Sequence, residues 1–125
     1  MKFSLSGMTT LRIKETPRAV RTEIKDATLY VYLVDGRVIG VPLNWYPRLE
    51  YGLPEERIES EVWKDGEVLV WPILDEHIPV EAIVAGRKSE EGSTSFSRWK
   101  KKLDAFRSEK RTPEWGVVKP LPANL

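Results

Sequence analysis

The stretch DGRVIGVPLNWYPRL at residues 35–49, with the alternating residues just before it, decides the fold of this chain. Residues 29–34 place two leucines and a valine on one face of a strand, and two tyrosines and a valine on the other. All of these are strand-forming types. Asp35-Gly36 supplies the left-handed backbone of a tight turn. Residues 37–41 return as the partner strand, which Pro42 ends because proline cannot donate a ladder hydrogen bond. The sequence therefore predicts a β-hairpin here.

Two more regions have the pattern of strands. Residues 21–25 alternate weakly and predict a short strand. Asp65-Gly66 is a second tight turn, flanked by strand-forming residues at 62–64 and 67–71. Pro72 stops the last of these strands. We expect the strands to form one small curled antiparallel sheet of four to five strands.

Short helices are predicted beside this sheet. Asn44 can cap a helix that begins at Trp45. Pro54 begins a second helix, because proline is well tolerated in a first turn. Ile58 and Val62, four residues apart, would form the apolar face of this second helix.

A third short helix is predicted at about residues 79–85, with Gly86 as its C-terminal stop. Two to three short helices beside an antiparallel sheet place the chain in the α+β class. We assign three units: an N-terminal arm at 1–20, an α+β core domain at 21–89, and a basic C-terminal helix with an extended tail at 90–125.

The C-terminal unit contains the clearest helix, at residues 96–110, which Ser95 caps and Pro113 ends. A polar linker at residues 87–95 precedes it. Spacings of three, four and three give the helix a single apolar stripe. The stripe consists of Phe96, Trp99, Leu103 and Phe106. Basic residues cover the other faces, and the proline-rich remainder is expected to lie extended along a surface.

Composition limits the class of protein. The chain has 125 residues, of which 41% are hydrophobic and 31% charged, as expected for a soluble globular protein of one core. It has no cysteine, which excludes disulfides, thiolate metal sites and cysteine nucleophiles. No apolar run is long enough for a signal peptide or a membrane span, so we expect a cytoplasmic protein.

Charge is unevenly distributed, although the net charge is +1. Residues 1–20 hold four basic and one acidic residue (+3), residues 21–86 hold six and thirteen (−7), and residues 87–125 hold ten and five (+5). An acidic centre between basic ends can pair with those ends or with a charged partner.

Three motifs, in order, resemble the bacterial family called domain of unknown function 2442. They are DGRVIGVPLNWYPRL at 35–49, PEERIESEV at 54–62 and VWPILDEHIPVEAIVAG at 70–86, and the resemblance covers residues from about 20 to 89. The last motif is similar to the family pattern WP-x-LDE-x-I-x-VE followed by a small residue and glycine. The resemblance implies a small α+β domain that acts as an antitoxin-like protein or an accessory, partner-binding subunit. Some members are fused to a helix-turn-helix, from which this chain departs because residues 96–125 hold one helix.

His77 is the sole histidine, and three carboxylates lie near it in sequence: Asp75, Glu76 and Glu81. A catalytic hypothesis makes His77 a general base oriented by Asp75 or Glu76. We favour the alternative, in which His77 is a polar residue in the turn before a helix. The carboxylates could bind a hard cation, but at helix starts they more often complement the helix dipole. We expect no catalytic residue, no metal and no cofactor.

Aromatic residues near the sheet have two interpretations. Trp45, Tyr46, Trp63 and Trp71 could stack on nucleic-acid bases, but packing in the core and at its rim is favoured. Arg48 is expected to lie exposed beside Tyr46, as an interaction anchor does.

We therefore expect a non-enzymatic protein-binding module whose C-terminal helix contacts a partner encoded by a neighbouring gene. Its apolar anchors would be Phe96, Trp99, Leu103 and Phe106, steered by Lys100, Lys101 and Arg107. Docking of the same stripe on its own domain is equally compatible with the pattern. The alternative function is a nucleic-acid-binding or regulatory protein that uses the basic helix. A second copy of the chain is also open as a partner, and a membrane is not expected.

Overall fold

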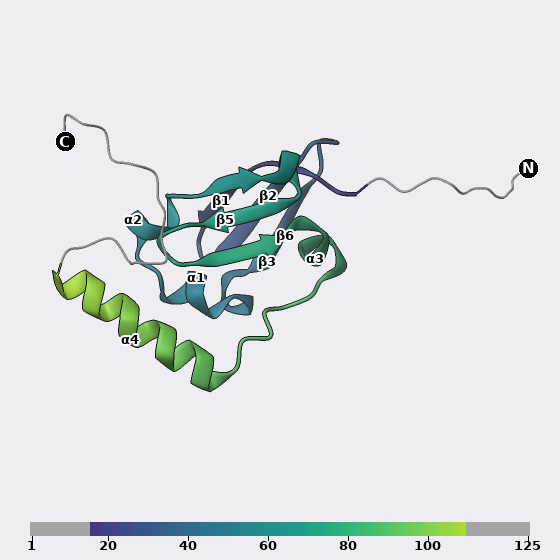
Figure 1. Ribbon diagram of the computed structural model, residues 1–125. Helices are drawn as coiled ribbons and strands as arrows, with labels where there is room; N and C mark the ends of the chain where they lie inside the picture. The colour runs from purple at the N-terminus through teal and green to yellow at the C-terminus, as the bar shows by residue number, and fades with distance from the viewer. Residues whose placement is uncertain (1–15, 110–125) are drawn as a thin grey trace, which may run out of the picture.

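Six strands form two antiparallel sheets in the computed structural model, which describes residues 16–109 (Figure 1). The first sheet has the order β1 (Ala19–Lys25), β2 (Thr28–Leu33), β3 (Val38–Pro42). The second has the order β4 (Glu61–Trp63), β5 (Val68–Trp71), β6 (Glu76–Pro79). Both predicted hairpins and the α+β class are confirmed. The expectation of a single sheet of four to five strands is wrong.

The two sheets meet at β1 and β4 without sharing a hydrogen-bond ladder. At one end of this seam, a Cβ on Gly66 would lie 2.9 Å from the carbonyl oxygen of Ala19. Further along, the hydroxyl oxygens of Thr22 and Ser60 lie 3.5 Å apart, so side chains meet between the strands. The alternation of side chains within a hairpin could not predict that the strands form two sheets. Alternation indicates which face of a hairpin is buried, but not which strand of one hairpin lies beside which strand of the other.

The connection from β3 begins with a 3₁₀ turn, η2 (Leu43–Trp45), followed by α1 (Pro47–Tyr51). The predicted helix is present but begins at Pro47, two residues later than expected, and the predicted cap is wrong because Asn44 lies inside η2. Tyr46 is extended, with φ −126° and ψ 92°, because the ring of the following proline disfavours helical backbone in the preceding residue.

The next helix, α2 (Pro54–Arg57), begins where it was predicted but lasts a single turn. Val62 belongs to β4, and Ile58 is 78% exposed. The predicted apolar helix face formed by these two residues is therefore wrong. Ile58 instead lies on the surface, at the point where the chain turns from α2 toward β4.

The second hairpin turns through η3 (Lys64–Gly66). Residues 76–79 form β6, and α3 (Val80–Ala85) follows directly, so the predicted third helix begins one residue later than expected. Gly86 ends α3 as predicted. Its φ of +76° is a left-handed conformation that glycine adopts without strain.

The long helix α4 (Ser93–Glu109) starts three residues before the predicted Phe96. It lies along one side of the sheets, near α1 and α2 (Figure 1). No helix within residues 16–109 is both long and apolar enough to cross a bilayer. The expected arm up to residue 15, the stop at Pro113 and the extended tail lie outside the described residues.

The inner faces of both sheets enclose one core, which α3 and α4 help to close. Leu29, Val31 and Leu33 all point into it, which confirms the alternation predicted for β2. Burying each such side chain contributes about 1.5–3 kcal/mol. Other large, fully buried side chains are Leu49, Leu69, Trp71, Leu74, Ile83 and Leu103.

Candidate functional site

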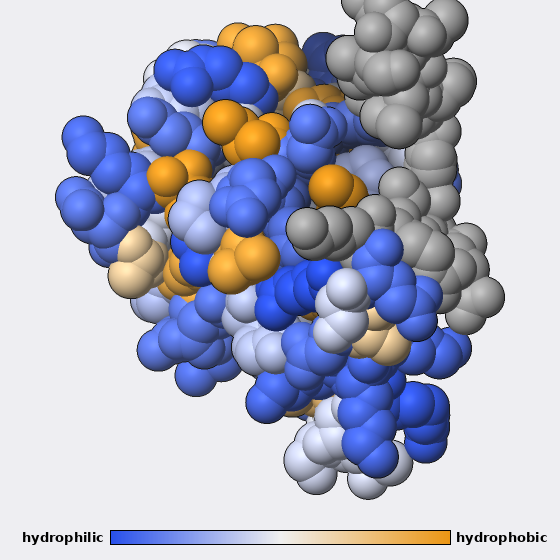
Figure 2. All heavy atoms as spheres, turned by 90° about the vertical axis from the view of Figure 1, so that its left-hand side faces the viewer, coloured by the Kyte–Doolittle hydropathy of each residue, from blue (hydrophilic) through white to orange (hydrophobic). Residues whose placement is uncertain are grey.

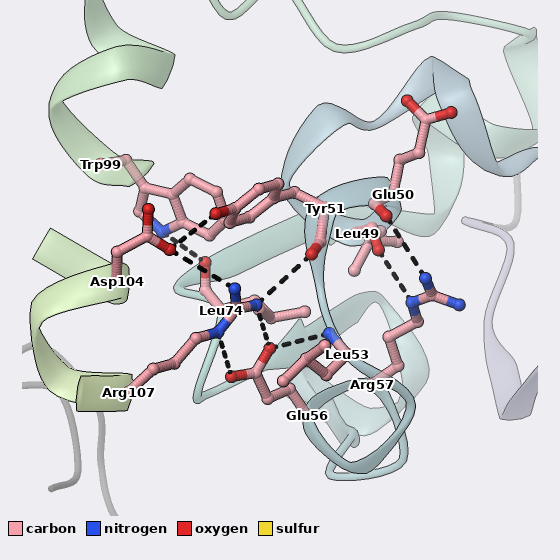
Figure 3. Close-up of polar contacts among 10 residues, drawn as sticks. All are labelled: Leu49, Glu50, Tyr51, Leu53, Glu56, Arg57, Leu74, Trp99, Asp104 and Arg107. Carbon is pink, nitrogen blue, oxygen red and sulfur yellow. Dashed lines mark hydrogen bonds and ion pairs between the residues drawn. The ribbon is translucent and has the colours of Figure 1, made fainter. Parts of the chain in front are cut away.

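The apolar stripe of α4 packs against its own domain. Trp99, Leu103 and Phe106 are buried, and Phe96 is half-buried. The indole N–H of Trp99 donates to the carbonyl oxygen of Leu74 at 3.0 Å, as Figure 3 shows. The sequence left two possibilities for this stripe, docking on a partner or on its own domain, and in the structure it docks on its own domain.

Polar contacts hold the end of α4 (Figure 3). The guanidinium of Arg107 donates to both carboxylate oxygens of Glu56, at 2.6 and 2.9 Å, and to the carbonyl oxygen of Tyr51 at 3.3 Å. Glu56 is 7% exposed and also accepts the N–H of Leu53 at 2.8 Å. The Tyr51 hydroxyl donates to Asp104 at 2.6 Å, which raises the pKa of the tyrosine. Together these contacts attach α4 to α1 and α2.

This arrangement changes what the predicted contact residues can do. Arg107 and the apolar stripe are occupied within the chain, so they could meet a partner only if α4 left its place. Lys100 and Lys101 are exposed, and Lys100 lies 5.0 Å from the ring centre of Tyr51. A partner-binding role for these residues stays a prediction.

The expectation that Arg48 lies exposed beside Tyr46 is wrong. Tyr46 is 3% exposed, and its hydroxyl donates to the carbonyl oxygen of Arg87 at 3.0 Å. Arg48 is mostly buried, with 18% of its side chain exposed, and forms a bidentate pair with Glu91 at 2.6 and 2.9 Å. It also donates to the carbonyl and carboxylate oxygens of Asp75. Arg48 therefore joins the turn before β6 to the linker before α4, which the local sequence could not indicate.

One carboxyl near Arg48 has an unusual acidity. Burial raises the pKa of Glu76 to about 7, although the positive charge of Arg48 acts in the opposite direction. The Arg48 guanidinium lowers the pKa of Glu91 by donating to it. Glu76 is therefore the group of this cluster that titrates near neutral pH.

The geometry does not bring His77 and Glu76 together. Because they are neighbours in β6, their side chains leave opposite faces of the strand. His77 is exposed and packs edge-on against Trp63, with 5.4 Å between the ring centres. Asp75 is held by Arg48. Within residues 16–109 there is also no cluster of three or more potential metal-binding side chains. The structure thus gives the proposed general base no orienting carboxylate among these neighbours.

A cavity of about 350 Å³ opens where the seam between β1 and β4 widens. Seven residues from β1, α2 and the loop after α2 line it: Thr22, Glu23, Ile24, Pro54, Arg57, Ile58 and Ser60. The volume is at the small end of the range of known ligand pockets, about 300–1,000 Å³. We regard this cavity and its apolar rim as the candidate site.

Large apolar side chains are exposed at the cavity and on the segments that flank α2 in sequence. Ile58 lines the cavity and is 78% exposed, while Leu53 before α2, and Val62 and Trp63 in β4, are partly exposed. Figure 2 looks onto the side of the molecule where α2 lies and shows apolar side chains reaching the surface in several places, above a mostly hydrophilic lower region. Sequence reasoning missed this site, because its walls come from segments about 30 residues apart. The sequence pattern assigned Ile58 to a buried helix face, and so it gave no signal of this site.

Comparisons with known proteins agree with this fold. A family model described as a protein of unknown function (DUF2442) matches residues 19–89. A crystal structure of a protein of unknown function from Rhodospirillum rubrum is similar, with a TM-score of 0.55 and 23% identity, over 62% of this chain and 95% of that chain. The search of curated proteins found no match. The family match ends before α4 begins.

Proposed function

We propose that this chain, which belongs to the family of proteins of unknown function DUF2442, is a non-enzymatic protein-binding module that binds its partner at the cavity between β1 and α2. The observation that carries the proposal is the exposure of Ile58. A side chain of this size that is 78% exposed beside a cavity leaves apolar area in water, and such area marks interaction sites when it is part of a larger patch.

A second exposed apolar side chain lies on β4, the strand that follows the loop lining the cavity. Trp63 is 43% exposed and is held in position by its indole N–H, which donates to Glu61 at 2.7 Å, and by its contact with His77. Partly exposed aromatic residues with one polar contact are enriched where proteins meet. A side chain that is already held in position reduces the entropy lost on association.

The experiment is a comparison of two apolar-to-acidic variants of the full chain, each expressed with a tag in its own host. Ile58→Asp is expected to lose the proteins that co-purify with the wild type. Val84→Asp is the comparison variant, because Val84 is a β-branched side chain that is 40% exposed on α3, away from α2 (Figure 1), where it lines a different cavity of about 330 Å³. Equal recovery of partners by both variants would exclude the cavity as the binding site.

A second candidate function uses the outward face of α4. Arg98, Lys100, Lys101 and Lys102 are all exposed, so one short surface carries four positive charges. A nucleic acid bound there would release counterions, and its affinity would fall steeply with salt concentration. The test is a mobility shift with single- and double-stranded nucleic acid at 50 mM salt. A Lys101→Glu variant that binds as well as the wild type would remove this candidate.

A further inference from the structure

We infer that Arg48 and Glu76 form a latch, which holds α4 on the core while Glu76 is protonated and releases it as Glu76 becomes ionised. A switch of this kind needs a titratable group beside an element that has two arrangements, here docked and released. Release would expose the apolar stripe of α4, which the sequence predicts as a partner contact. The inference goes beyond the proposed function and does not depend on the cavity.

Arg48 lies where three segments meet. From α1, its guanidinium donates to both carboxylate oxygens of Glu91 in the linker and to the carbonyl oxygen of Asp75 in the turn before β6. The guanidinium carbon also lies 5.2 Å from the ring centre of Trp99, within the range of a cation–π contact. Trp99 in turn donates to the carbonyl oxygen of Leu74, in the same turn. Arg48 therefore connects the turn, the linker and the first half of α4.

Glu76 faces this cluster from β6 and is half-buried. Within residues 16–109, no group donates a hydrogen bond to its carboxyl. Burial raises its pKa to about 7; among the charged neighbours, Arg48 lowers the pKa, whereas Glu91 and Asp75 raise it. Tyr46, just before α1, is the other titratable group that senses Glu76. Burial, and then the charge of Glu76, raises the pKa of the tyrosine hydroxyl.

The coupling between Glu76 and the linker acts in both directions. Glu91 raises the pKa of Glu76 because like charges repel, so ionisation of Glu76 weakens the hold of Arg48 on Glu91 by the same free energy. The larger cost is the desolvation of the ionised carboxylate, which falls when water reaches it. Movement of the linker away from Arg48 admits that water, and the linker leads directly into α4. Ionisation therefore favours the released state.

The size of the effect follows from the acidity of Glu76 in the two states. In the closed state its pKa is about 7, and full hydration would return the pKa to its ordinary value of 4.5. The closed state thus binds the proton more tightly, and a rise in pH favours opening. Between pH 6 and pH 8, the equilibrium constant for opening should rise by up to about tenfold.

Hydrogen exchange of the full ¹⁵N-labelled chain, followed by NMR, tests the latch. The amide of Ser89 reports on the linker, because it donates to the carbonyl oxygen of Trp45, and the amide of Leu103 reports on the middle of α4. The amide of Val31, in the central strand β2, reports on global unfolding. From pH 6 to pH 8, the protection factors of Ser89 and Leu103 should fall about tenfold. These two should depend weakly on added urea, and Val31 strongly.

Three variants of the full chain identify the titrating group. Glu76→Gln is permanently uncharged, so its Ser89 and Leu103 amides should be equally protected at pH 6 and pH 8. Glu67→Gln makes the same change at an exposed carboxylate just before β5 and should keep the tenfold response. Asp75→Asn removes a charge that raises the pKa of Glu76, so the response should move to lower pH.

Several results would overturn the inference. Equal urea dependence at Leu103 and Val31 would mean that α4 leaves the core only when the whole chain unfolds. Unchanged protection between pH 6 and pH 8, or a change at Ser89 alone, would mean that α4 is not released. A response that persists in Glu76→Gln would assign it to another group. If that variant does not fold, an unchanged pH response in Asp75→Asn overturns the inference instead.

Discussion

Replacing Arg107 by methionine tests the attachment of α4 most directly. The change keeps the length and apolar volume of the side chain but removes the charge that neutralises Glu56. The two side chains are 23% and 10% exposed. Removing one partner from a fully buried ion pair costs about 3–5 kcal/mol, whereas an exposed pair is worth about 0–1 kcal/mol. Because Glu56 keeps its hydrogen bond from the Leu53 N–H, we expect a loss of about 2 kcal/mol in the free energy of unfolding.

Urea unfolding measures this loss. Tryptophan fluorescence and far-UV circular dichroism should be followed together, because coincident curves show that α4 and the sheets unfold as one unit. With a slope of about 1–3 kcal/mol per molar urea, the midpoint should fall by about 0.7–2 M. Lys101→Met is the matched control, since Lys101 is exposed on the same helix and should change the free energy by less than about 0.5 kcal/mol.

The double variant Glu56→Gln with Arg107→Met distinguishes the mechanism. If the single variant is unstable because a carboxylate is left buried without its cation, neutralising Glu56 should recover about half of the loss. The reasoning is refuted if Arg107→Met and Lys101→Met unfold at the same urea concentration, or if the double variant is no more stable than Arg107→Met.

Three further changes have defined outcomes. The pKa of Glu76 is raised to about 7 from an ordinary value near 4.5, so the free energy of unfolding of the wild type should fall as the pH rises between these values. Urea unfolding at pH 5 and pH 8 measures this dependence. Glu76→Gln should make the difference between the two pH values smaller by about 1–2 kcal/mol. Gly66→Ala and Gly36→Ala both place alanine at a φ near +97°, but only the alanine at 66 would meet backbone atoms, those of Ala19. Gly66→Ala should therefore lower the free energy of unfolding by at least about 1 kcal/mol more than Gly36→Ala. Equal thermal midpoints of the two variants would contradict the close approach of η3 to β1. Leu103→Ala should cost about 2–5 kcal/mol because the side chain is 1% exposed, and a cost below 1 kcal/mol would mean that α4 is not docked.

The sequence by itself determined the local elements whose signals lie within a few residues. The alternation in β2 and the turn at Asp35-Gly36 predicted the first hairpin, and Asp65-Gly66 predicted the second. The apolar stripe of α4 predicted a helix with one buried face, and that face is buried. Such signals succeed because steric preference and side-chain periodicity act over short distances. The family motifs placed the same elements in the right order.

Only the tertiary structure decided where these elements meet. The apolar stripe of α4 could pack equally well on a partner or on its own domain. It packs on its own domain because Trp99 donates a hydrogen bond to Leu74 and Arg107 donates to Glu56. The exposure of Ile58 likewise depends on α2 ending after one turn. The separation of the sheets, and the cavity between β1 and α2, arise from contacts between residues about 30 to 40 positions apart. Local sequence carries no information about such contacts, because their free energy exists only once distant segments have been brought together.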